Sequence, residues 1–298
     1  MLYEDKPKWV EQIDLIETHE KVLGGLGGPT NRPTIELANR TRWLYENMRI
    51  PILENLTLEV TAAGNDETGG LDSPFRQPQA AIDWAIANLD FRNPTILTIS
   101  LQTGSYEHLE IRAIPQGVIF LKINGTNSDN TLIKYLSSHA PCEIEISDVG
   151  FNGYAANRNN AMIIAYTGAT IILTNNVSFF PQPGCCPVIS HNGGHIFVQN
   201  ANFILRPGSY FAIFTVSSVG TVRVGSSSIM VDTGVSVSNA FVYSTLAGVF
   251  ISENMPMSNT ITGKRYTADS GGRILSNSTA DTWACSQPGT NDGTALVI

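Results

Sequence analysis

The residues with the clearest capacity for chemistry lie together in the segment CCPVISHNGGH, residues 185–195. Cys185 and Cys186 are followed by His191 and His195, and thiolate and imidazole are the usual ligands of tetrahedral zinc. The spacing therefore admits a metal site. A disulfide between adjacent cysteines is strained, so the sequence predicts free thiols here.

Carboxylates offer a second kind of chemistry. Glu143 and Glu145 lie two residues apart, and alternate residues of a strand share a face at a spacing of about 7 Å. Glycoside hydrolysis needs two carboxyl groups about 5 to 10 Å apart, so this pair fits an inverting hydrolase. The alternative is that both glutamates are solvated, or paired with Lys122 or Arg112. A site built between subunits would recruit further acids, namely Asp148, Asp232 and Glu253.

The elements that must position these residues are short β-rich segments, and they repeat. Five of them begin 27, 25, 26 and 27 residues apart, at Ile144, Ile171, Ile196, Val222 and Val249. A second set repeats independently and ends in Gly168, Gly194, Gly220 and Gly248. A fixed period in the twenties predicts an all-β solenoid, whose coils stack about 4.8 Å apart. The leucine-rich repeat shares this period, but its leucine spacing and its helix are absent.

The period also arranges side chains in columns along the solenoid. A polar column is predicted at Asp148, Asn175, Asn200, Ser226 and Glu253. Asn and Asp bond their own backbone in turns, so this column predicts a turn-stabilising ladder. Its two acids are four coils apart, about 19 Å at the spacing of a sheet, which is too far for them to act together in one chain.

An outward column lies beside the polar one. It is predicted at Glu145, Ile172, Phe197, Arg223 and Phe250. Apolar side chains on an outer face indicate either a trimer interface or a glycan-contact face, and the interface is favoured.

The same alignment weakens the metal hypothesis. Tyr166, or Ser244 and Thr245, occupy the place of His191 in other copies of the repeat. The intervening turn sends His191 and His195 in different directions, so they remain weak candidates only. We expect neither a metal nor any other cofactor.

Composition limits the partners. The chain has 298 residues, a formal net charge of -8 and only 15% charged residues, which argues against a nucleic-acid partner. No run of 18 apolar residues occurs and the amino terminus lacks a signal-peptide pattern, so we expect cytoplasmic synthesis without membrane insertion.

The repeat and the segments on either side of it divide the chain into four predicted regions. Residues 1–60 contain two predicted helices, one over residues 7–23 and one after Thr34, a candidate N-cap. Residues 61–95 form a linker and a capping helix that Pro78 opens. The solenoid occupies residues 96–260, and residues 261–298 form a β cap.

Three segments resemble proteins of bacteriophage tails. VLGGLGGPTNRPTIELANRTRWL, residues 22–44, resembles the attachment region of tail fibres and tailspikes. DETGGLDSPFRQPQAAIDWAI, which begins at Asp66, resembles the opening of pectate-lyase-like β-helices, and GKRYTADSGGRI resembles an element near the carboxyl ends of fibre proteins.

The resemblance implies a right-handed parallel β-helix in a homotrimeric virion fibre. Such a protein is made in the cytoplasm of the infected bacterium. Its amino-terminal region, residues 1–60, is expected to attach to the phage baseplate or another tail protein and to help the chain trimerise. We expect it to bind a capsule or lipopolysaccharide glycan of the host. The alternatives are a polysaccharide depolymerase, acting as a glycosidase or a lyase, and a structural fibre or baseplate component without glycan contact.

Overall fold

The computed structural model describes residues 32–155, 160–253, 255–277 and 283–298. The chain divides into two compact units, Met1–Ile50 and Pro51–Ile298. In the first unit, helix α1 runs over Arg32–Asn47. It begins before Thr34, so the predicted N-cap is wrong; Pro33 falls in the first turn, where a missing N–H costs nothing. The helix expected over residues 7–23 lies outside the described residues.

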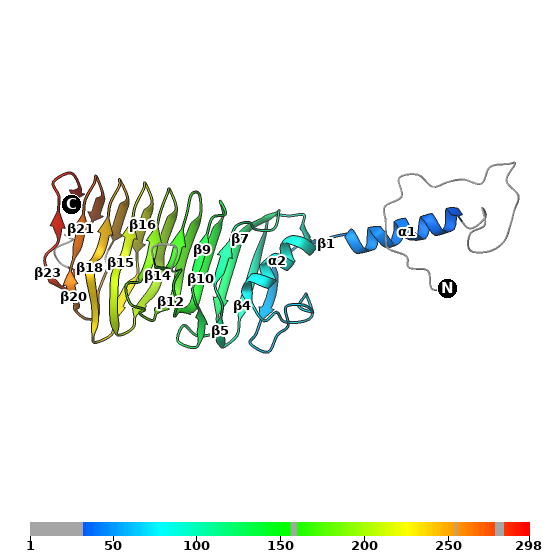
Figure 1. Ribbon diagram of the computed structural model, residues 1–298, viewed down its shortest axis with the longest axis horizontal. Helices are drawn as coiled ribbons and strands as arrows, with labels where there is room; N and C mark the ends of the chain where they lie inside the picture. Colours follow the sequence, from blue (N-terminus) through cyan, green and yellow to red (C-terminus); the bar gives the residue numbers. More distant parts are fainter. Residues whose placement is uncertain (1–31, 156–159, 254, 278–282) are drawn as a thin grey trace, which may run out of the picture. The chain divides into compact units, whose positions relative to one another are not determined.

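The second unit is a right-handed parallel β-solenoid of about 7 turns with coils of about 26 residues, as the sequence predicts. Figure 1 shows the strands of successive coils side by side in chain order. The main path of the 13-stranded sheet, called sheet 1, consists of β2 (Leu56–Val60), β4 (Thr95–Leu101), β7 (Val118–Gly125), β10 (Glu143–Phe151), β12 (Thr170–Phe179), β14 (His195–Leu205), β16 (Thr221–Gly225), β19 (Val249–Glu253), β22 (Arg273–Ser276) and β25 (Leu296–Val297). Off this path lie β5 (Gly104–Tyr106), β8 (Thr131–Ile133) and β17 (Ser228–Val231).

The 10-stranded sheet, called sheet 2, forms the other side of each coil. It contains β6 (Leu109–Ile111), β9 (Leu136–Ser138), β11 (Ala161–Ala165), β13 (Cys186–Ser190), β15 (Gly208–Val216), β18 (Val235–Ser244), β20 (Ile261–Lys264), β21 (Tyr266–Ala268), β23 (Cys285–Gln287) and β24 (Thr290–Asn291). Both sheets thus continue beyond residue 260, through the region in which a cap is expected.

Helix α2 (Pro78–Asn88) packs against β2, β4 and β6, at the amino-terminal end of the solenoid. Pro78 occupies its first turn, as expected, and Gln77 is the N-cap residue. The helix buries Ala81, Ile82 and Ala85. Its apolar face thereby covers the first coil, whose core would otherwise meet water. The short strands β1 (Ile50–Ile52) and β3 (Leu89–Phe91) complete the described elements.

The core lies between the two sheets and contains a column of aromatic rings. Phe179 stacks between Phe151 and Phe203, with ring centroids 5.7 and 4.4 Å apart. The column continues through Phe214 and Phe250 to Trp283. Phe151 and Phe179 are in register on adjacent strands, Phe203 lies two residues before the register partner of Phe179, and Phe214 comes from sheet 2. Rings from both sheets therefore fill the interior together.

The bend within each coil carries the predicted polar ladder. Asp148, Asn175, Asn200 and Ser226 all adopt left-handed backbone conformations, with φ between 50° and 55°. Asn and Asp tolerate this region better than most residues. The side chains also bond across coils, because Asn175 Nδ2 donates to Asp148 at 3.2 Å.

Glu253 does not belong to this ladder. It pairs in register with Gly225, one position before Ser226. The next residue of the chain, Asn254, lies outside the described residues. The alignment fails here because the last copy of the repeat begins at Phe250 rather than at Val249.

The turns that join sheet 2 to sheet 1 explain the repeated glycines. Between β13 and β14, Asn192 and Gly193 have φ values of 50° and 77°, and the N–H of Gly194 donates to the carbonyl of His191 at 3.1 Å. A Cβ on Gly194 would lie 2.3 Å from the carbonyl oxygen of Ala165, so only glycine fits. The equivalent of Gly194 in the preceding coil is Ala169 rather than Gly168, because Thr170 pairs with His195.

Candidate functional site

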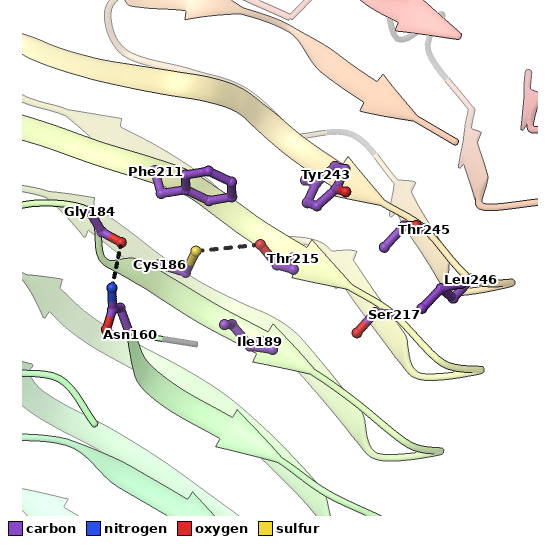
Figure 2. A pocket seen from close by; sticks show the side chains of 10 residues that line it. All are labelled: Asn160, Gly184, Cys186, Ile189, Phe211, Thr215, Ser217, Tyr243, Thr245 and Leu246. Carbon is purple, nitrogen blue, oxygen red and sulfur yellow. Dashed lines mark hydrogen bonds between the residues drawn. The ribbon is translucent and has the colours of Figure 1, made fainter. Parts of the chain in front are cut away.

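A groove of about 640 Å³ lies on the outer face of sheet 2. It is formed by β13, β15 and β18, by the turns beside them and by Asn160, which precedes β11 (Figure 2). Its lining residues are Asn160, Gly184, Cys186, Ile189, Phe211, Thr215, Ser217, Tyr243, Thr245 and Leu246.

The floor of the groove is apolar. Cys186 and Ile189 belong to a second apolar cluster, separate from the central core, together with Ala161, Ile164 and Ala212. The residue before Ile189 in β13, Val188, belongs to the central core instead. The residues in register with Val188 are Ile163 and Phe214, which also belong to that core. Cys186 and Ile189 are only 2% and 1% exposed, so the floor is closely packed.

Two aromatic side chains rise from the strands beside the floor. Phe211 is 37% exposed and sits at an irregularity of β15, between Tyr210 and Ala212, where the register with β18 shifts. Such an irregularity re-aims a side chain, and here it turns a phenyl ring outward. The ring of Tyr243 on β18 lies edge-on to it, with centroids 6.2 Å apart.

The polar groups of the groove are hydroxyls and one amide. Thr215 Oγ1 donates to Cys186 Sγ at 3.5 Å, and Asn160 Nδ2 lies 3.5 Å from the carbonyl oxygen of Gly184, as Figure 2 shows. The Ser217 hydroxyl lies 2.7 Å from His191 Nδ1. Because hydroxyls donate and accept, this set suits a ligand with many hydroxyls.

The lining is electrically neutral. None of its ten residues has a carboxylate, an ammonium or a guanidinium group. Burial raises the pKa of the Cys186 thiol above its ordinary value, so the sulfur stays protonated near neutral pH. Burial, and then the charge of Asp269, likewise raise the pKa of Tyr243. The groove can bind a ligand, but it lacks the two carboxyl groups of a glycosidase.

The predicted acid pair does not face this groove. Glu143 and Glu145 lie on β10 of sheet 1, and Glu143 is exposed. Glu145 Oε1 lies 3.2 Å from Lys122 Nζ, in the next strand, as the alternative interpretation expected. This ion pair accounts for Glu145 without catalysis.

The other candidate acids are separated from one another. Asp148 accepts hydrogen bonds from two asparagines of the polar ladder, Asn175 and Asn176. Asp232 accepts from Arg206 Nη1 at 3.2 Å.

Glu253 forms an ion pair with Arg223. Arg223 also belongs to the predicted outward column, so Glu253 contacts this column rather than the ladder.

The outward column on sheet 1 differs from the prediction at one residue. Glu145, Ile172, Phe197 and Arg223 are in register on adjacent strands. The next position is Ile251, because Phe250 pairs with Val222 and is fully buried in the aromatic column. Phe250 therefore contacts neither a glycan nor another subunit.

The cysteines and histidines of residues 185–195 do not converge. His191 follows the end of β13, and its ring stands edge-on to Tyr166, whereas His195 begins β14 beside Phe197. Both cysteines are free and buried. Among the described residues, no group of three or more His, Cys, Asp or Glu side chains could hold a metal.

Sequence reasoning missed the groove, although part of the signal was present. Ile189, Thr215 and Tyr243 occupy one column of the second strand set. Extending the alignment outward from that set would have found them. Phe211 leaves no such signal, because it stands at a register shift that the repeat does not predict.

Comparison with known proteins adds no relatives. No family model matches the chain, and neither a curated protein nor a solved structure matches it. Neither helix in the described part of the chain combines the length and the apolar character needed to cross a membrane.

Proposed function

We propose that this chain is a host-recognition protein of a bacteriophage tail, a homotrimeric fibre or tailspike that binds a bacterial surface polysaccharide. The groove on sheet 2 carries this proposal. It combines two aromatic rings, the exposed ring of Phe211 and the half-buried ring of Tyr243, with hydroxyls that can bond sugar hydroxyls. Aromatic rings pack against the C–H faces of sugars. The likeness of residues 22–44 to tail attachment segments supports a place in the virion.

Binding without cleavage is the preferred activity. The groove has no carboxylate, Glu143 is exposed on sheet 1, and the other predicted acids are engaged in ion pairs or in the ladder. A depolymerase would need two carboxyl groups facing one sugar, or a base beside an acidic sugar. The groove is the observation that favours glycan binding over a purely structural fibre.

The first test measures glycan binding by the purified protein on an array of bacterial capsule and lipopolysaccharide glycans. We expect one glycan class to bind, and we expect Phe211→Ala with Tyr243→Ala to weaken that binding at least tenfold. Met230→Ala is the matched control, because Met230 is an exposed apolar residue of β17, outside the groove.

Two results would contradict the proposal. Release of oligosaccharides or reducing ends from the bound glycan would replace it with a depolymerase. Failure to bind any glycan, by a protein that keeps its native circular dichroism, would favour the structural component.

A further inference from the structure

We infer that the groove takes an uncharged sugar that carries an acetamido group, with the acetyl methyl on the floor formed by Cys186 and Ile189. The inference rests on the proposed glycan binding and specifies its ligand. Three features of the groove carry it: the composition of the floor, an amide and a carbonyl beside the floor, and the neutrality of the lining.

The floor favours a methyl group over a hydroxyl. It presents a thiol and an aliphatic side chain. The Thr215 hydroxyl beside the floor already donates to the sulfur of Cys186. A sugar hydroxyl placed against this floor would lose its hydrogen bonds to water without gaining a good partner. A methyl group makes no such hydrogen bonds and would lose none.

An amide and a carbonyl stand beside the floor. Asn160 Nδ2 and the Gly184 carbonyl oxygen are 3.5 Å apart, which is long for an N–H···O bond. Asn160 adjoins the floor directly, since its own carbonyl accepts from the N–H of Cys186 at 2.9 Å.

An acetamido group can replace this single long contact with two bonds. Its N–H can donate to the carbonyl of Gly184, and its carbonyl can accept from Asn160 Nδ2. Both polar groups of the ligand are then satisfied while its methyl lies on the floor. A hydroxyl at the same carbon of the sugar provides neither the methyl nor the second bond.

Charge excludes acidic sugars. The lining contains no cation, and the chain carries a net charge of -8. A uronate, sialate or phosphate in the groove would surrender hydration without a counter-charge. Phe211 and Tyr243 remain available for the pyranose ring itself, whose faces are neutral.

The test compares three trisaccharides by isothermal titration calorimetry with the full chain. Chitotriose carries acetamido groups, cellotriose carries hydroxyls on the same β1,4-linked backbone, and trigalacturonate carries carboxylates. We expect chitotriose to bind at least tenfold more tightly than cellotriose, and trigalacturonate to show no binding.

Asn160→Asp tests the geometry, because it keeps the shape of the side chain and removes its donor. We expect it to weaken chitotriose about tenfold and to leave cellotriose unchanged, with Met230→Ala as control and circular dichroism as the check on folding. Filling the floor with Cys186→Met should act in the same selective way.

The outcomes separate this inference from the proposed function. Equal affinity for chitotriose and cellotriose, or indifference to Asn160→Asp, would overturn the acetamido assignment and leave glycan binding intact. Absence of binding to these three sugars and to the glycan array would overturn both. Loss of self-association in Phe211→Ala, measured by sedimentation, would make the groove an interface between copies and would also overturn both.

Discussion

Phe211 and Tyr243 reach the same groove by different structural routes. Tyr243 follows the repeat, in register with Thr215 and next to the core residue Val242. Phe211 departs from the repeat, at the irregularity of β15. The position of Tyr243 therefore follows from the sequence repeat, whereas that of Phe211 does not.

Gly194 shows what a single residue of the turn contributes. We expect Gly194→Ala to destabilise the protein by more than about 2 kcal/mol, because its Cβ would lie 2.3 Å from the Ala165 carbonyl oxygen and the turn would have to move.

Gly193→Ala is the matched control. Nothing lies within 4 Å of a Cβ at Gly193, so only the left-handed backbone costs energy, about 1 kcal/mol. Urea denaturation of both variants measures the difference. Equal losses of unfolding free energy would show that close approach does not determine the choice of glycine at position 194.

Single residues also mark the limit of prediction from sequence. The repeat in the sequence places Ile172, Phe197 and Arg223 correctly in one column. It then places Phe250 in that column, where the structure has Ile251. Shifting the alignment by one residue moves a side chain to the other face of the strand, so the alignment places the buried ring of Phe250 on the surface. The interval between copies of the repeat varies by one or two residues. Alternation of apolar and polar residues usually fixes the register, but here the two adjacent residues, Phe250 and Ile251, are both apolar.

At the scale of elements, the stacked strands share one interior. The strands of sheet 1 and the helix opened by Pro78 could be predicted, because alternation and the proline are local signals. The loops could not, and Asp129 is an example. It precedes β8 and contacts Arg206, which follows β14, 77 residues later in the chain.

The aromatic column gives a prediction for one strand. Phe203 of β14 is fully buried between Phe179 and Phe214, so we expect Phe203→Ala to cost about 3–5 kcal/mol of unfolding free energy.

Phe197 in the same strand provides the comparison. Its ring faces outward in the sheet 1 column and is partly exposed, so Phe197→Ala should cost less than about 1.5 kcal/mol in the isolated chain. Chemical denaturation measures both variants. A larger loss in Phe197→Ala than in Phe203→Ala would contradict the stacking of the core.

At the scale of the whole molecule, the solenoid unit Pro51–Ile298 has its own core and cap. Its outward column on sheet 1 contains Ile172, Phe197 and Ile251, which a homotrimer would cover. We therefore expect light scattering of the full chain to return three times its mass of 32.3 kDa.

The variant Phe197→Glu separates this interface from the groove. A charge in the outward column should dissociate the trimer, whereas Phe211→Glu in the groove should leave the mass unchanged. A monomeric mass for the unmodified protein would contradict the trimeric fibre.

The parallel stacking of the coils has a consequence for how the molecule is made. Each strand bonds to partners roughly one coil away, about 26 residues along the chain, and no two consecutive strands of the large sheets form a hairpin in the described residues. Each of these pairings must close a loop of about one coil before its hydrogen bonds can form, so parallel sheets fold slowly. The solenoid must then grow by adding coils to a bare strand edge, which can also pair with the edge of another unfinished chain. This protein is therefore most prone to aggregation while it is partly folded. Substitutions that slow the folding of one coil should reduce the yield of native protein even where the folded structure tolerates them.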